Sequence, residues 1–232
     1  MRLIDLFEEM DKKHTKLKEL IENEYFRIKE QLNRVPTRMD LFSYMDDSIY
    51  QQAIKNSKEN PFKRYLEYRK DLNELSLEEE QLYQGIGKDF IIELENTRMT
   101  KVYKMPVLMA FYNHGHIRME LTEDELLKSW KEFFSTGSNW KDFFSSDSSD
   151  ITYKRYQVIS DKEHINKIKD MPVKFLLKSS KSFFIKKDGS VIALKDDLKD
   201  VINNPVFIKE ISDVIEYRVM DYYQRRYREK EI

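Results

Sequence analysis

Cysteine is absent from this 232-residue sequence. Its absence excludes disulfide bonds, thiolate metal ligands and cysteine nucleophiles, and it fits a reducing compartment, so we expect a cytoplasmic protein. Long apolar runs are absent too, and no segment approaches the ~20 apolar residues of a membrane-spanning helix. The N-terminal residues MRLIDLFEEMDKK carry acids where a signal peptide needs an unbroken apolar stretch. We therefore expect no membrane association.

Glycine and proline are scarce, with 5 of each, whereas charged residues make up 36% of the chain. A β-sandwich or barrel needs many turns, so this composition favours a mainly α-helical fold with a small β component. Aromatic residues reach 13%, which is too many for a disordered chain. The sequence therefore predicts a folded, multi-helix protein.

Neither sign of charge is in excess, since 41 Lys and Arg face 42 Asp and Glu. The balance argues against a protein that binds polyanions over its whole surface, and only local basic patches can be proposed.

Motifs of known catalytic chemistry are also missing. The chain has no G-x-x-x-x-G-K-[ST] phosphate loop, no G-x-G-x-x-G, no helicase box and no G-x-S-x-G. We expect no ATP hydrolysis, no catalytic residues and no cofactor in this chain by itself. The one close histidine pair, His114 and His116, has no third histidine nearby, so we expect no metal site. His14 and His164 look like surface residues.

The region from Glu67 to Glu95 is strongly acidic. A solvated helical face is the simplest interpretation. A carboxylate metal site, and with it an unrecognised nuclease, stays open as an alternative.

Helical spacing of apolar residues predicts one long helix, or two abutting ones, over residues 3–32. The next segment, NRVPTRMDLFSYM, has Asn33 as a helix-ending residue and a capping pattern from Thr37 to Asp40. Helix, tight turn and helix is the local pattern of a helix-turn-helix. Arg34 and Arg38 flank the turn, where they could contact phosphate or simply be solvated in a helical hairpin.

Three prolines open apolar helices in the second half, at Pro106, Pro172 and Pro205. Capping patterns predict further helix starts at Thr122 and Ser160. The Ser-rich residues 135–150 predict a loop.

Two short segments, IRMEL (117–121) and ITYKRYQV (151–158), look strand-like. A β-hairpin is expected over 182–194, because two β-branched and aromatic runs meet at Asp188-Gly189. A hairpin that follows a helix has the shape of the wing in a winged helix. We divide the chain into an N-terminal helical region with the helix-turn-helix-like segment (1–96), a winged-helix-like region (97–150) and a C-terminal region with the hairpin (151–232).

The stretch Thr97 to Arg118 is free of acidic residues, between acidic segments on both sides. Its basic residues are candidate phosphate contacts, with Arg34 and Arg38 as a second patch. The four candidates in the stretch are Arg98, Lys101, Lys104 and Arg118. From Lys162 to Lys187 the chain carries eight further lysines against two acids.

Four segments together resemble a known group of proteins: NRVPTRMDLFSYMDD, ENTRMTKVYKMPVLMAFYN, FLLKSSKSFFIKKDG and DVIEYRVMDYYQRRY. They are similar to the C-terminal region of bacterial DEAD/DEAH-box superfamily II helicase-like proteins. The resemblance covers about residues 25–227, and the motor domains are not in this chain. It implies nucleic-acid handling, in the setting of restriction or anti-phage defence.

Two functional hypotheses follow. The first is a non-catalytic, DNA-binding accessory module of a helicase-like system. The alternative is a protein-interaction module that docks a motor or another partner through its first helix and the acidic region. Near-zero net charge favours the alternative, whereas the basic segments and the wing-like hairpin favour the first.

Overall fold

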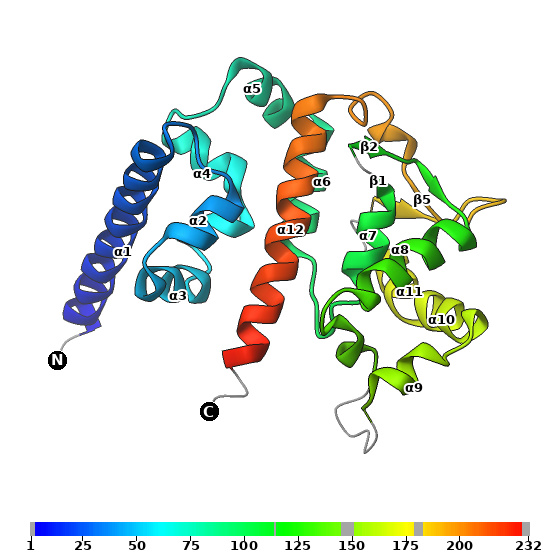
Figure 1. Ribbon diagram of the computed structural model, residues 1–232. Coiled ribbons are helices and arrows are strands. Elements are labelled where there is room, and N and C mark those ends of the chain that lie inside the picture. Colours follow the sequence, from blue (N-terminus) through cyan, green and yellow to red (C-terminus); the bar gives the residue numbers. More distant parts are fainter. Residues whose placement is uncertain (1–2, 114, 145–150, 179–182, 229–232) are drawn as a thin grey trace. The chain divides into compact units, whose positions relative to one another are not determined.

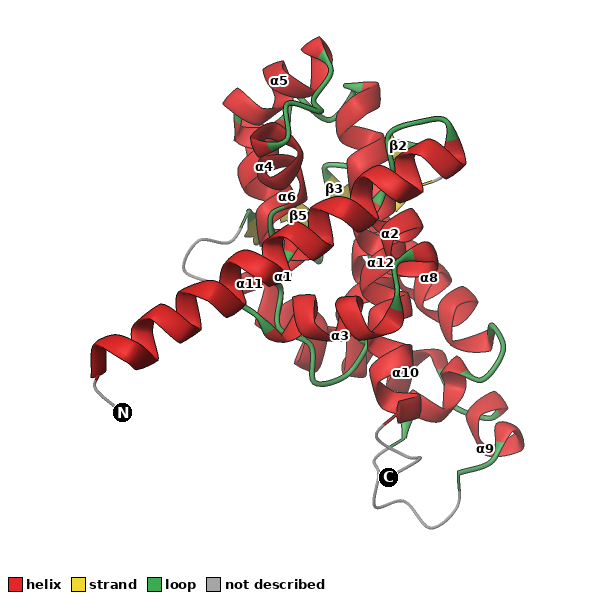
Figure 2. Cartoon of the chain, turned by 90° about the vertical axis from the view of Figure 1, so that its left-hand side faces the viewer, coloured by secondary structure: helices red, strands yellow, loops and turns green. Residues whose placement is uncertain are grey.

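The structure, a computed structural model, describes residues 3–113, 115–144, 151–178 and 183–228. It is mainly helical with a few short antiparallel strands, as the composition predicts (Figure 2). The chain forms two compact units, Met1–Gln84 and Gly85–Ile232, called unit 1 and unit 2 below. No helix in the described residues combines the length and apolar character that a membrane crossing requires.

Unit 1 is built on one long helix that contacts two short ones. Ile21, Tyr25 and Ile28 of this first helix are buried, and the helix ends at Asn33, which adopts a left-handed conformation with φ 52°. These features confirm the predicted helix and its end. The elements of unit 1 are α1 (Leu3–Leu32), α2 (Arg38–Tyr44), α3 (Asp47–Lys55), a 3-10 turn (Pro61–Lys63), α4 (Tyr65–Asp71) and α5 (Leu77–Gln84).

Unit 2 begins with α6 (Ile86–Asn96), which packs along α12 (Pro205–Arg228), the long red helix of Figure 1. The apolar side chains Phe90 and Phe207 meet in this contact, with ring centroids 5.9 Å apart. Helix α6 is therefore part of unit 2, although the sequence division at residue 96 placed it with the first region.

The chain between those two helices contributes the remaining helices and all the strands of unit 2. They are α7 (Lys104–Phe111), β1 (Tyr112–Asn113), β2 (His116–Ile117), β3 (Glu120–Leu121), α8 (Glu123–Ser135), a 3-10 turn (Asn139–Phe143), α9 (Tyr153–Gln157), α10 (Asp161–Ile168), a π-helical turn (Lys169–Val173), α11 (Lys174–Leu177), β4 (Phe184–Ile185), β5 (Ile192–Leu194) and a 3-10 turn (Asp196–Leu198). Helix α8 packs on both α7 and α10 around the fully buried Trp130.

The strands of the larger sheet come from distant parts of the chain. Their order is β3-β5-β4, all antiparallel, with Leu121 opposite Ile192 and Phe184 opposite Leu194. The predicted hairpin is present, and Gly189 has φ 82° in its turn, a conformation that glycine adopts without strain. Because β3 pairs with β5, residues on both sides of position 150 belong to one folded structure.

Two predictions about the second half are wrong. Residues 153–157 form helix α9 and no strand, with Thr152 as its N-cap. Pro172 opens no helix but lies inside a continuous helical stretch from α10 to α11. The π-helical turn accommodates it, since a hydrogen bond from the Lys174 amide to the Lys169 carbonyl widens the turn around a residue that has no N–H.

Candidate nucleic-acid interface

The stretch α10–α11 is held on α8 by polar contacts at its start. Ser160 caps α10 through a capping box with Glu163, as predicted. Lys131 of α8 bridges to Asp161 at 2.7 Å. The indole nitrogen of Trp130 donates a hydrogen bond to Nδ1 of His164, at 3.2 Å.

His164 is thus a buried residue, with 2% of its surface exposed, and the prediction of a surface histidine is wrong. Its ring packs against Phe143 and Tyr156, at centroid distances of 5.1 and 5.6 Å. Burial, and then the charge of Lys131, hold the pKa of the imidazole below its usual value. The neutral ring accepts the Trp130 hydrogen bond, so His164 helps to fix the orientation of α10.

Four lysines of the same stretch are exposed to solvent. We call this set the lysine face, and its exposed lysines are Lys162, Lys169, Lys174 and Lys178. Lys169 forms an ion pair with Glu123. The other three have no carboxylate within ion-pair distance among the described residues, so their charge is available to an outside anion.

The hairpin loop adds two neighbouring lysines that differ in their surroundings. Lys187 pairs with Glu120 of the adjacent strand β3. Lys186 is exposed and pairs with no carboxylate of the described chain. The tip of the hairpin therefore presents one cation that the sheet does not neutralise.

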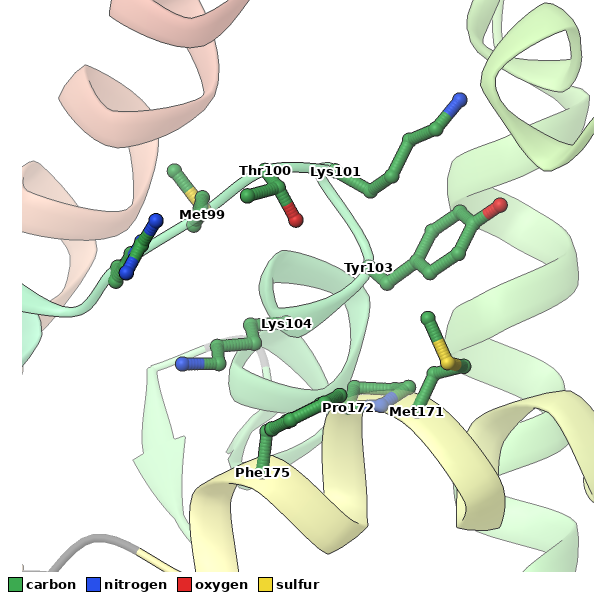
Figure 3. A pocket seen from close by; sticks show the side chains of 9 residues that line it. Met99, Thr100, Lys101, Tyr103, Lys104, Met171, Pro172 and Phe175 are labelled. Carbon is green, nitrogen blue, oxygen red and sulfur yellow. The ribbon is translucent and has the colours of Figure 1, made fainter. Parts of the chain in front are cut away.

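The predicted residues Arg98, Lys101 and Lys104 lie on and after the loop that joins α6 to α7, beside two adjoining cavities of about 350 and 750 Å³. Both cavities are lined by Arg98, Lys104 and Phe175, and together we call them the Lys104 cleft. Lys104 and Lys101 extend to opposite sides (Figure 3).

All three predicted residues line the smaller cavity, but their polar contacts differ. The Lys101 amine donates to the Phe144 carbonyl at 3.1 Å, and the Lys104 amine donates to Thr97 Oγ1 at 3.2 Å. Arg98 is exposed and makes no ion pair within the described residues. Arg98 and Lys104 therefore line both cavities, whereas Lys101 lines only the smaller one and its amine is hydrogen-bonded to the Phe144 carbonyl.

Arg118, the fourth residue of the basic stretch, contributes to neither the lysine face nor the Lys104 cleft. It lies just before β3, and its guanidinium is 3.2 Å from Glu125 Oε1 in the first turn of α8. A phosphate would compete with this carboxylate for the guanidinium.

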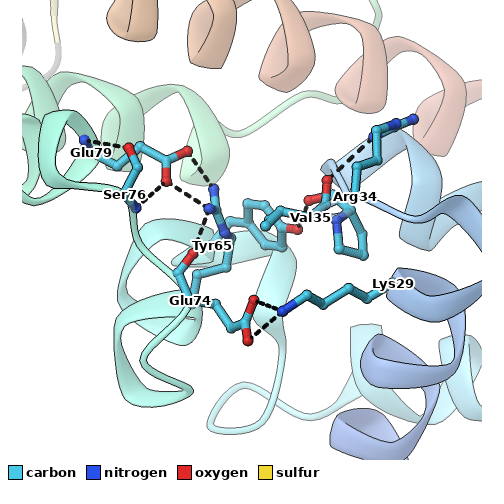
Figure 4. A network of polar contacts seen from close by, with 9 residues as sticks. Lys29, Arg34, Val35, Tyr65, Glu74, Ser76 and Glu79 are labelled. Atoms are coloured by element: carbon cyan, nitrogen blue, oxygen red, sulfur yellow. Dashed lines mark hydrogen bonds and ion pairs between the residues drawn. The ribbon is translucent and has the colours of Figure 1, made fainter.

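The second predicted patch, Arg34 and Arg38, lies in unit 1 and is engaged there. Arg34 forms a two-pronged ion pair with Asp40, at 2.6 and 2.8 Å, and donates to the Val35 carbonyl (Figure 4). Arg38 is fully buried, and its guanidinium lies 4.7 Å from the centre of the Tyr65 ring. Both arginines stabilise the turn into α2.

Acids of the 67–95 region have internal partners too. Glu74 accepts from Lys29, and Glu79 caps α5 together with Ser76 (Figure 4). Glu79 also holds the buried Arg69 with two hydrogen bonds of 2.7 Å. These acids organise unit 1, and the described residues contain no group of three or more His, Asp and Glu side chains placed to hold a metal ion. His114 lies outside the described residues.

None of the four lysines of the lysine face was among the residues predicted to contact phosphate. The run of lysines from 162 to 187 was the signal that could have found it, because a seven-residue spacing places Lys162 and Lys169 on one side of a helix and a four-residue spacing does the same for Lys174 and Lys178. Comparison with known proteins gives no independent help, since no family model, no curated protein and no solved structure matches this chain.

Proposed function

We propose that unit 2 is a DNA-binding module whose winged-helix-like part spans residues 104–194. One observation carries the proposal: helices α7, α8 and α10–α11 alternate with strands whose spatial order is β3-β5-β4. Helix, strand, two helices and a hairpin is the order of a winged helix. In that arrangement the last helix enters the major groove and the hairpin lies along the neighbouring backbone.

The charges fit the same docking. The last helix carries the lysine face, and the wing carries Lys186, which is where such a module contacts phosphates. The chain has nearly equal numbers of acids and bases, so binding would depend on this one face and not on the whole surface. The arrangement also differs from a simple winged helix, because 25 residues (136–160) separate α8 from α10.

The resemblance to helicase-like tails supports the same function, because a motor on DNA gains from a second contact with the duplex. The alternative function, docking of a protein partner, still rests on the first helix. The acidic region supports it less, since Glu74 and Glu79 are engaged inside unit 1.

Fluorescence anisotropy with a labelled duplex tests the proposal. Lys174→Glu reverses one of the unpaired charges of the lysine face and should weaken binding at least tenfold, or about 1.4 kcal/mol. Lys209→Glu, an equal change at an exposed position of α12, is the matched control and should change affinity less than twofold. Equal losses in the two variants, or no duplex binding by the wild-type chain at about 50 mM salt, would overturn the proposal.

A further inference from the structure

The Lys104 cleft contains an amine in an unusual setting. Lys104 is half-buried in the first turn of α7, and Thr97 Oγ1 accepts its hydrogen bond. The guanidinium of Arg218 donates a hydrogen bond to the backbone carbonyl of the same Thr97. Burial and then the Arg218 charge lower the pKa of the Lys104 amine. At any given pH, a larger share of this amine is neutral and nucleophilic than for a solvated lysine.

Glu93, on α6, lines the same cleft and has the opposite perturbation. Its Oε2 is buried without a hydrogen-bond partner among the described residues, while the carboxylate accepts a hydrogen bond from the Phe183 amide. Burial raises the pKa of this carboxyl group. Glu93 therefore keeps its proton to higher pH than an exposed glutamate, as a proton donor requires.

The attraction between Lys104 and Glu93 favours the charged form of each, but burial outweighs it in the pKa of both groups. Lys104 and Glu93 line one cavity but form no ion pair within 4 Å. Two groups in one cavity whose environments favour their neutral forms indicate acid–base chemistry. A lysine that is desolvated beside a second cation is the arrangement by which proteins make an amine reactive toward carbonyl carbon.

The position of the cleft indicates which carbonyl compound could reach it. Met171 and Phe175, from the helix that carries the lysine face, line the cleft, and Phe175 is 52% exposed. Duplex DNA on the lysine face would therefore lie beside the opening, where Arg98 could hold a phosphate. The aldehyde that DNA itself offers is the ring-opened deoxyribose of a site that has lost its base.

We infer that Lys104 forms an imine with the aldehyde of a ring-opened deoxyribose and that Glu93 supplies the proton for this step. The inference deepens the proposed function and rests on it for the source of the sugar, since DNA binding would bring the abasic site to the cleft. The same chemistry would accept a free deoxyribose phosphate.

The atoms balance without an outside reagent. The neutral amine of Lys104 attacks the aldehyde carbon, the carbonyl electron pair moves to oxygen, and a proton passes from nitrogen to that oxygen to give a carbinolamine. The Glu93 carboxylic acid then protonates the hydroxyl group, which leaves as water while the nitrogen lone pair forms the C=N bond. The products are a protonated imine on Lys104, a Glu93 carboxylate and one water.

Borohydride trapping tests the inference, because it reduces the imine to a stable secondary amine. The full chain is incubated with a duplex that carries one abasic site, with the intact duplex, and with free 2-deoxyribose 5-phosphate. Each reaction is reduced, and modified lysines are located by peptide mapping. With the abasic duplex, Lys104 should carry at least tenfold more adduct than Lys209, an exposed lysine.

Three outcomes are informative. Adduct on Lys104 from the abasic duplex supports the inference together with DNA binding. Adduct on Lys104 from the free sugar alone, with no binding of the intact duplex, keeps the chemistry and overturns the proposed function. Adduct spread equally over surface lysines, or none on Lys104 with either probe, overturns the inference even if the duplex binds.

Two variants separate chemistry from folding. Lys104→Arg keeps a cation in the cleft and should abolish trapping at that position. Glu93→Gln keeps an acceptor for the Phe183 amide and should slow trapping about tenfold while Lys104 stays the modified residue. An unchanged trapping rate in Glu93→Gln would remove Glu93 from the mechanism. Thermal unfolding of each variant checks the fold.

Discussion

The arginines of unit 1 and the lysines of the lysine face carry the same charge, but the fold uses them differently. Arg34, Arg38 and Arg69 each contact a carboxylate or an aromatic ring, and Arg69 is only 4% exposed. Lys162, Lys174 and Lys178 contact no carboxylate of the described chain and face solvent. A basic residue is thus a candidate for phosphate binding only when no group of the folded protein neutralises its charge.

The largest effect is expected inside unit 1. Arg69→Met removes the partner of Glu79 and the donor to the Glu74 carbonyl, so unit 1 should lose about 3 kcal/mol of stability. Hydrogen-exchange mass spectrometry on peptides from residues 62–84 should show exchange accelerated more than a hundredfold, since this loss multiplies the open population by that factor.

Lys58→Met, which removes an exposed lysine of the same unit, is the control and should leave those rates nearly unchanged. If hydrogen exchange in Arg69→Met is accelerated less than tenfold, the buried Arg69–Glu79 pair is dispensable for stability. The contrast between the paired arginines of unit 1 and the unpaired lysines of the lysine face would then be weaker.

A smaller effect is expected at the link between α8 and α10. Because the folded state lowers the pKa of His164, the unfolded chain takes up the proton first as the pH falls. The stability that depends on neutral His164 is therefore complete above its ordinary pKa of 6.5 and is lost as the pH falls through the lower folded value. Lys131 and Lys167 favour the neutral ring, whereas Asp161 and Glu163 oppose it.

His164→Asn tests this link, because its amide oxygen can still accept from Trp130. We expect a loss of about 1 kcal/mol at pH 7.5, from the smaller side chain, and a flatter dependence between pH 7.5 and 5 than in the wild type. Urea unfolding followed by tryptophan fluorescence measures both. Parallel pH profiles in the two proteins would show that another group titrates.

The smallest effect concerns the wing. Lys186→Ala should weaken duplex binding about threefold, whereas Lys187→Ala should have less effect, because Glu120 already neutralises Lys187. The two variants differ by one position and by nothing in chemistry, so each controls for the other. A larger loss in Lys187→Ala would show that the strand ion pair opens when DNA binds.

Local features of the fold were predictable from sequence, because a few neighbouring residues determine them. The capping boxes at Thr37, Thr122 and Ser160, and the turn at Gly189, are present as predicted. The short run 151–158 was predicted wrongly, since alternation over so few residues does not separate a strand from a helix. Thr152 accepts a hydrogen bond from the Arg155 amide at 3.3 Å and so starts a helix there.

The candidate site was less predictable, because it depends on which charges remain unpaired. Nothing in the sequence states that Arg34 will meet Asp40, or that Arg38 will be buried against Tyr65. Nor does it state that strand β3 will pair with β5, about 70 residues later, which is what assembles the winged-helix-like order. Charge density along the chain does not distinguish basic residues that pair inside the fold from basic residues that stay unpaired.

The most direct test of the central claim is the salt dependence of duplex affinity in three proteins. If the lysine face binds the phosphate backbone, the logarithm of the wild-type binding constant falls linearly with the logarithm of salt concentration. Lys174→Ala should reduce the slope by about 0.9, the contribution of one neutralised phosphate, and Arg34→Ala should leave it unchanged. A reduced slope in Arg34→Ala, with none in Lys174→Ala, would contradict the assignment of the lysine face as the DNA-binding surface.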